Sequence, residues 1–223
     1  MGQAIGQVLS LAVGVALSPI PIIGVVLMLG TPRGRANGPA FLAGWIGGLA
    51  VVGTVVLLVS GGADASESGQ PADWVNVLKL VLGVLLLRLA LQRWRERSRE
   101  GGEPELPGWM QSIDRFTAAR AAGFGVVLSA VNPKNLVLTV GAASAIAQTG
   151  VAAGKQAVAL AVFVAIATVG TGAPVALFFA LGERSRRTLE GLKEWMARNN
   201  ATVIAVVCLL IGAKLIGDGI AGF

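Results

Sequence analysis

Lys134 is the residue whose type and position point most directly to chemistry. It lies inside a long apolar segment, 14 residues after Arg120 and 14 residues before Gln148. In a helix that rises about 1.5 Å per residue, Lys134 would lie about 21 Å from either of them, and a lysine side chain reaches only roughly 6 Å. If the segment crosses a bilayer, the ammonium must face the protein interior or water, as functional intramembrane charges do. The alternative is a structural lysine that binds the carbonyls of a broken helix.

Two proline-containing strings interrupt otherwise apolar segments. They read Ser18-Pro19-Ile20-Pro21 and Asn132-Pro133-Lys134-Asn135. Proline has no N–H to donate, and unwound backbone inside a membrane is tolerated only within protein or beside water. Half-helix N-termini at such breaks carry partial positive charge, which suits an anionic group. We therefore expect a substrate site that consists of Ser18, Pro19, Pro21, Asn132, Pro133, Lys134 and Asn135.

Four further polar residues lie in apolar segments. Thr168 and Thr171 stand beside glycines and make their segment locally polar, so we add both to the expected substrate site; close packing of small residues is the alternative. Lys214 and Asp218 are four residues apart and can pair on one helix face. This pair is either a gate or coupling site, or a plain interfacial ion pair.

Several kinds of chemistry are excluded by the residues that the chain lacks. It has no histidine and a single cysteine, Cys208, which rules out an internal disulfide, a Cys₂His₂ zinc site and a Ser–His–Asp triad. Asp218 is the one acid clearly inside an apolar segment, so a hard divalent cation would lack oxygen ligands. We predict no metal, no cofactor and no enzymatic activity, because a hydrolase without histidine would need a cluster of acids.

The composition is that of a membrane protein. Of the 223 residues, 54% are hydrophobic and 13% are charged, and the mean hydropathy is +0.73. A soluble domain of this size could not bury so much apolar surface. A net charge of +6 might suggest nucleic acid in a soluble protein, but in a membrane protein basic residues report topology. We therefore expect membrane lipids, and no nucleic acid, as surroundings and partners.

Six apolar segments are long enough to cross a bilayer, which needs roughly 20 residues per helix. They cover residues 5–29, 40–60, 74–92, 117–147, 156–181 and 200–221. The predicted fold is an all-α integral membrane protein with six transmembrane helices, of which the first and the fourth are broken at mid-membrane. Before the last segment, Leu189, Leu192, Trp195 and Met196 fall near one helical face and predict a short interfacial helix.

The basic residues gather on one side of this topology. The loops after the first, third and fifth segments and their flanks hold 14 of the 18 basic residues: Arg33, Arg35, Arg88, Arg93, Arg95, Arg97, Arg99, Arg115, Arg120, Arg184, Arg186, Arg187, Lys193 and Arg198. Positive residues favour the cytoplasmic side. The sequence therefore predicts a multi-pass protein of the cytoplasmic (inner) membrane with both termini extracytoplasmic.

The two halves of the chain show the same order of features. Residues 1–94 and 114–223 each hold a proline-broken segment, a short loop, a plain segment, a loop and a segment with a late basic residue, and residues 95–113 form a cytoplasmic linker. Two unrelated proline kinks are the alternative. Because each half has an odd number of spans, two related halves would be inverted, an arrangement that many transporters use around a mid-membrane site. The whole chain is then a single transmembrane domain.

Three parts of the sequence together resemble a known family. They are the string from Ser18 to Ile23, the loop from Thr31 to Trp45 (TPRGRANGPAFLAGW) and the string from Asn132 to Leu136. This pattern resembles the GAP family, the peptidoglycolipid- or sulfolipid-addressing proteins of actinobacteria, within the lysine exporter (LysE) superfamily. The resemblance covers nearly the whole chain. It implies a six-helix exporter that moves cell-envelope glycolipids across the inner membrane.

These observations together predict an exporter or flippase for a lipid-linked or amphipathic anionic cell-envelope molecule. A proton-coupled exporter of amino acids or other small solutes is the first alternative. A non-transporting partner of an envelope-synthesis complex is the second. The expected partners are membrane lipids and the anionic substrate, and the interpretation also allows a homodimer and contacts with envelope-synthesis proteins.

Overall fold

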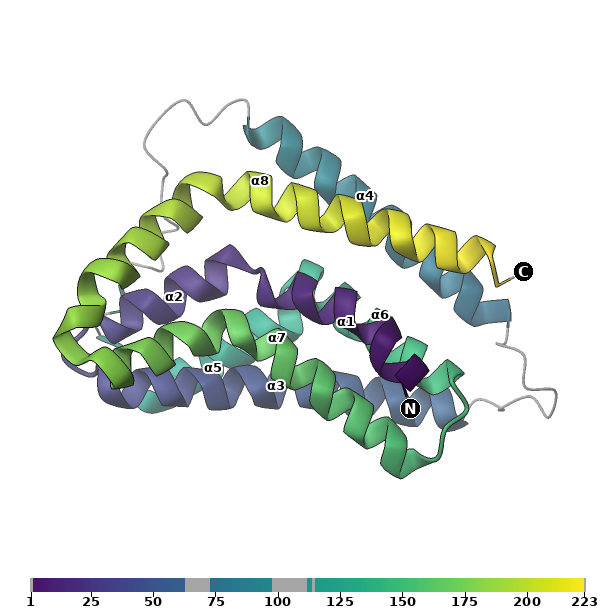
Figure 1. Cartoon of the computed structure of the whole chain (residues 1–223), viewed down its shortest axis with the longest axis horizontal. Helices are drawn as coiled ribbons and strands as arrows, with labels where there is room; N and C mark the ends of the chain where they lie inside the picture. The colour runs from purple at the N-terminus through teal and green to yellow at the C-terminus, as the bar shows by residue number, and fades with distance from the viewer. Residues whose placement is uncertain (1, 63–72, 98–111, 114, 223) are drawn as a thin grey trace.

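The computed structural model describes residues 2–62, 73–97, 112–113 and 115–222, and the regular elements in these residues are all helical (Figure 1). Most of the predicted linker, residues 95–113, lies outside the described residues. The elements in chain order are α1 (Gly2–Ala16), α2 (Pro19–Leu29), α3 (Gly34–Gly62), α4 (Asp73–Arg97), α5 (Ala118–Val126), the π-helical η2 (Val127–Val131), α6 (Pro133–Gln148), α7 (Ala153–Leu181), the 3₁₀ turn η3 (Gly182–Arg184) and α8 (Ser185–Ile220).

Three to five of the predicted spans are present by length and composition. Helices α3, α7 and α8 are each long and apolar enough to cross a membrane, and the bent pairs α1–α2 and α5–α6 add two more if each pair counts as one span. Helix α4 is 25 residues long, but it carries Lys79, Arg88 and further basic residues at its C-terminal end. The sixth span therefore stays a prediction.

Both predicted helix breaks are present, and each is shorter than expected. The α1–α2 pair bends by 46°, and the segment before Asn132 bends by 65° against α6. Only Leu17 and Ser18 lie outside helix at the first break, and only Asn132 does at the second. Pro19 and Pro133 begin the following helices, where a missing N–H costs no intrahelical hydrogen bond. The prolines start the second half of each pair instead of lying in an unwound stretch.

The helices pair in a reciprocal pattern. Helix α3 of the first half packs on α5 of the second, α7 of the second half packs on α1 of the first, and α4 packs on α8. Figure 1 shows α4 and α8 side by side along one edge, with α3, α5 and α7 on the opposite side of the α1–α2 pair. Both termini lie toward one end of the bundle, and the α2–α3 and α7–α8 junctions lie at the other.

Glycines allow two of these pairs to approach closely. A Cβ at Gly44 of α3 would collide with the carbonyl of Ala122 in α5, and a Cβ at Gly125 of α5 would collide with the carbonyl of Phe41 in α3. Likewise, a Cβ at Gly170 of α7 would collide with the carbonyl of Ala16 at the end of α1. Small residues let backbones meet where lipid supplies no hydrophobic drive between helices.

The interfacial helix predicted before the last span is not an element of its own, because α8 runs without interruption for 36 residues from Ser185 and bends on the way (Figure 1); its interfacial position stays a prediction. At about 1.5 Å per residue α8 is about 54 Å long, well beyond a hydrocarbon core of about 30 Å. Leu189 and Met196 on its first turns are buried against the protein, whereas Trp195 is half-exposed. The amphipathic stretch is thus the start of α8, and its apolar face is covered by the protein.

Candidate site at the helix breaks

Lys134 lies at the point where the two broken helix pairs meet. Its side chain is 4% exposed, although it is charged and surrounded by apolar helices. Its Nζ donates to the Gly14 carbonyl at 2.7 Å, to Ser18 Oγ at 2.7 Å and to the Leu17 carbonyl at 3.4 Å. An ammonium has three donors, so all three have acceptors at the C-terminal end of α1. Lys134, from the second half of the chain, therefore caps the broken helix of the first half.

Two carbonyls at the first break lack their usual helical donors because those donors would be prolines. In a continuous helix the Leu17 carbonyl would accept from residue 21 and the Val15 carbonyl from residue 19, and both of these residues are prolines. Side chains take over: Lys134 Nζ approaches the Leu17 carbonyl, and Ser18 Oγ lies 2.6 Å from the Val15 carbonyl. The negative end of the α1 dipole also faces the ammonium, which favours the charge.

The second break is held by its own asparagines. Asn132 caps α6, because its side-chain oxygen accepts from the backbone N–H of Lys134 at 3.1 Å. Asn135 is fully buried, and its Nδ2 donates to the Leu128 carbonyl in η2 at 3.0 Å. Its Oδ1 lies 2.9 Å from Ser18 Oγ, whose single proton serves either this oxygen or the Val15 carbonyl. Ser18 and Asn135 thus join the two breaks directly.

A small cavity of about 70 Å³ adjoins this junction. Its lining includes Ser18, Pro19 and Pro21 from the first break and Asn132, Pro133 and Lys134 from the second. Thus six of the predicted site residues lie around one space, and Asn135 contacts one of them, Ser18. The remaining lining residues are Ile20, Leu89, Arg93 and Ile204.

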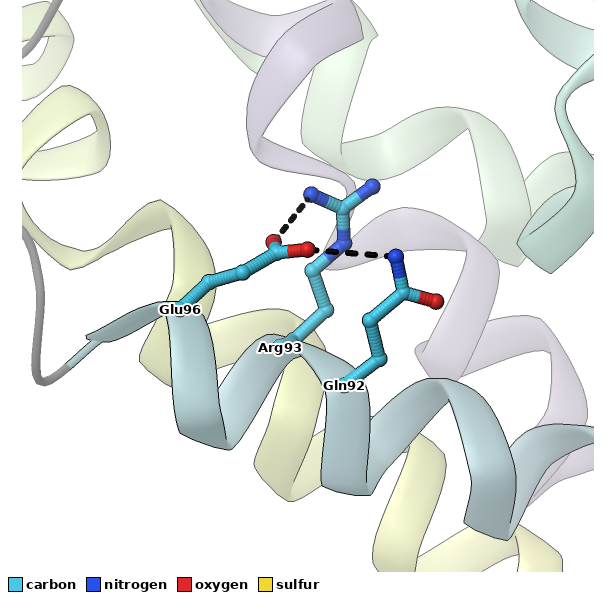
Figure 2. A network of polar contacts seen from close by, with 3 residues as sticks. All are labelled: Gln92, Arg93 and Glu96. Carbon is cyan, nitrogen blue, oxygen red and sulfur yellow. Dashed lines mark hydrogen bonds and ion pairs between the residues drawn. The ribbon is translucent and has the colours of Figure 1, made fainter.

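Arg93 of α4 is the lining residue that sequence reasoning missed, because it was assigned to topology alone. Its Nη1 donates to Glu96 Oε2 at 2.8 Å, and Gln92 Nε2 donates to Glu96 Oε1 at 3.1 Å (Figure 2). Its Nε is buried without a hydrogen-bond partner among the described residues. The available signal was spacing: Arg93 continues the buried face of Leu82, Leu86 and Ala90 at helical intervals.

The other four predicted residues do not join this site. Thr168 and Thr171 donate to the carbonyls of Val164 and Thr168 in their own helix, and neither lines the cavity. Lys214 and Asp218 form an ion pair within α8, with side chains 37% and 44% exposed, also away from the cavity lining. These positions agree with the packing and ion-pair interpretations.

The chemistry that this junction offers is recognition of negative charge. Two basic side chains, Lys134 and Arg93, line the same small space; its described lining contains no carboxylate, although Arg93 is paired with Glu96 beside it. Charge-assisted hydrogen bonds to sulfate, phosphate or carboxylate are short and strong in such surroundings. In the part of the chain that the structure describes, no three Asp, Glu, His or Cys side chains are grouped as metal ligands.

Comparison with known families decides the relationship. The family described as Sap, sulfolipid-1-addressing protein, matches residues 8–221, which is nearly the whole chain. The chain belongs to this sulfolipid-1-addressing family. Membership agrees with the sulfolipid-addressing part of the resemblance seen in the sequence, while the wider lysine exporter superfamily stays an expectation. Curated proteins and solved structures give no match.

Within this sulfolipid-1-addressing family member, the apolar helices indicate a membrane-embedded protein. Its cationic junction lies between two broken helices whose polar groups satisfy one another.

Proposed function

We propose that this protein exports or flips an amphipathic anionic molecule of the cell envelope, of the glycolipid type, across the inner membrane. The observation that carries the proposal is the placement of Lys134 and Arg93 on one cavity between two broken helices. Discontinuous helices that meet at a polar site recur in transporters, where they bind substrate near mid-membrane. The sulfolipid-addressing family makes a lipid the most economical source of the anion.

The proposal includes six spans and an inverted repeat. Helix α4 has the length for a crossing and packs along α8, and it presents apolar side chains such as Val77, Val81 and Val84 outward. The reciprocal pairs α3–α5 and α1–α7 are what two related halves would form. With the basic end in the cytoplasm, as positive residues prefer, both termini lie outside.

The cavity indicates how the site would work. Its volume of about 70 Å³ is far below the 300–1,000 Å³ of typical ligand pockets, so a lipid head group needs the junction to open. Opening separates Lys134 from the Gly14 carbonyl and Ser18 Oγ, and an anionic oxygen then replaces them as acceptor. In this way the substrate supplies the hydrogen bonds that the open junction loses, which lowers the free energy of opening only when the anion is bound.

Arg93→Gln tests this function in liposomes. The probe is a sulfated glycolipid with a fluorescent acyl chain, and its movement is followed by quenching from one side. We expect Arg93→Gln to lower the rate about tenfold, the size of one lost charge-assisted contact, while Arg95→Gln, an exposed neighbour on the same helix, keeps the rate. Equal rates in both variants would contradict the anion site. Absence of movement by the unaltered protein would favour a non-transporting partner of an envelope-synthesis complex.

The small volume between the breaks also favours a second candidate, proton-coupled export of amino acids or other small solutes. A molecule of that size needs less opening than a glycolipid head group does. The same liposomes, loaded with radiolabelled amino acids, separate the two functions. Efflux that depends on a proton gradient would support the second candidate, provided that the sulfated lipid does not move.

A further inference from the structure

A second and much larger cavity lies at the opposite end of α2 from the breaks. Its volume is about 720 Å³, which is within the range of pockets that hold whole ligands. It is formed by the C-terminal half of α2, the turn that follows it, the start of α3, the end of α7 and the first turns of α8. Val26 is the first residue of α2 in the cavity lining and lies eight residues after Ser18, so the cavity and the break are separated by about 12 Å along this helix.

The lining of this cavity is amphipathic. Apolar side chains of α2, α7 and α8 form one part of it, among them Leu27, Phe178 and Leu189. The polar part is mainly basic. Arg35, Arg186 and Lys193 line it together with one acid, Glu190.

We infer that this cavity binds one anionic amphiphile, with the sulfate, phosphate or carboxylate head group among Arg35, Arg186 and Lys193 and part of the acyl chain along the apolar wall. Charge complementarity supports an anion, because the described lining holds three cations and one carboxylate, and Arg35 and Lys193 alone already outnumber Glu190. The apolar wall supports an attached chain, because a free inorganic anion would leave that surface in contact with water. This inference rests on the proposed function in one respect: it takes the bound amphiphile to be the lipid that the protein transports.

The position of the cavity gives it a role before translocation. It lies at the end of the bundle where the α2–α3 and α7–α8 junctions are found, with Arg33, Arg184 and Arg187 nearby in sequence. Under the proposed topology this end faces the cytoplasmic leaflet. The cavity would therefore collect the lipid from that leaflet and present its head group to the break site along α2.

Photochemical labelling tests binding without measuring transport. The protein is placed in phosphatidylcholine nanodiscs with phosphatidylglycerol that carries a diazirine on one acyl chain, and the labelled peptides are identified by mass spectrometry. The comparison probe is phosphatidylcholine with the same labelled chain. We expect the anionic probe, and not the zwitterionic one, to label residues 26–32 and 178–193.

The matched variants remove equal charge at the same end of the molecule. Arg35→Gln combined with Lys193→Gln takes two cations from the cavity lining, whereas Arg33→Gln combined with Arg187→Gln takes two exposed cations outside it. We expect labelling by the anionic probe to fall about tenfold in the first double variant and to change little in the second. Equal losses would show a general surface-charge effect and would overturn the site, as would equal labelling by the two probes.

Two further arms separate the remaining outcomes. Sodium sulfate and sodium chloride are compared at equal ionic strength, so that screening is the same. Displacement of the probe by sulfate and not by chloride would support a head-group site for anions, whereas equal displacement by the two salts would show general charge screening and overturn the site. Labelling in a protein that moves no lipid would contradict only the proposed function, and lipid movement without labelling would contradict only this inference.

Discussion

At the residue scale, the ammonium of Lys134 has no donor to spare in this conformation. Its three acceptors lie on the first half of the chain, and its own helix begins one residue earlier, at Pro133. A buried charge of this kind is costly unless every donor is paired. Under the proposed function, the structural role and the binding role would be successive states of one residue: Lys134 caps α1 while the junction is closed, and it would become available to an anion once the junction opens.

Lys134→Met should destabilise the protein as well as abolish transport. Methionine fills a similar volume but cannot donate, so the buried Gly14 carbonyl loses the partner that it has at 2.7 Å. One unsatisfied buried acceptor costs about 1–3 kcal/mol. We expect a loss of that size in the free energy of unfolding, measured by titration with dodecyl sulfate and tryptophan fluorescence.

Lys214→Met is the matched control for this substitution. The pair that Lys214 forms with Asp218 is partly exposed and joins residues four apart on one helix. Such pairs contribute about 0.3–0.5 kcal/mol. The control should therefore unfold almost as the unaltered protein does. A Lys134→Met protein as stable as this control would show that the α1 cap contributes nothing, and the binding role alone would stand.

The candidate site could be predicted in its residues but not in its contacts. The depth of Lys134 in an apolar segment is visible in the sequence, and so are the prolines that free backbone carbonyls. The partners of Lys134 are not visible, because Gly14 is 120 positions away and carries no side chain to attract attention. Arg93 was missed because a basic residue near a helix end has an ordinary explanation in topology.

At the element scale, the α3–α5 contact depends on two glycines that face each other's backbones. Gly44→Ala places a methyl group against the Ala122 carbonyl, and neither backbone can move without disturbing the rest of the interface. Overpacking of this kind costs about 1–3 kcal/mol. We expect a lower free energy of unfolding by that amount in the same titration.

Gly47→Ala serves as the control on the same helix. A Cβ at Gly47 meets nothing within 4 Å, so the substitution adds no collision. Alanine favours helix over glycine by about 0.8–1.0 kcal/mol, so this variant should be unchanged or slightly more stable. Equal destabilisation of the two variants would mean that α3 is sensitive to any substitution and that the close approach is not the cause.

Element boundaries show where sequence patterns are sufficient. The prolines located both breaks to within a few residues, since proline acts through local backbone chemistry. The continuity of α8 was not predicted, because a charged amphipathic stretch followed by an apolar one looks like two helices. Tertiary contacts decide that case: Leu189 and Met196 are buried against the protein, and α8 bends without a break between these first turns and the part beside α4 (Figure 1).

At the scale of the whole molecule, the topology can be tested with two glycines. Gly154, at the start of α7, and Gly191, in the first turns of α8, are both exposed and have open space for a Cβ. In a Cys208→Ala background, we expect Gly154→Cys to react with a membrane-impermeant maleimide in intact cells and Gly191→Cys to react only after lysis. The reverse pattern would place the basic end outside and reject the proposed orientation.

The bond between Lys134 and the end of α1 has a consequence for biogenesis. The ribosome makes the first helix pair about 120 residues before it makes the side chain that caps it. At about 5–20 residues per second, that interval is roughly 6–24 s. During it, the Gly14 and Leu17 carbonyls depend on water, lipid head groups or an insertase, since the hydrocarbon core offers no donor. The nascent first half therefore needs a hydrated or chaperone-bound environment. Its insertion is completed only when residue 134 leaves the ribosome and enters the membrane.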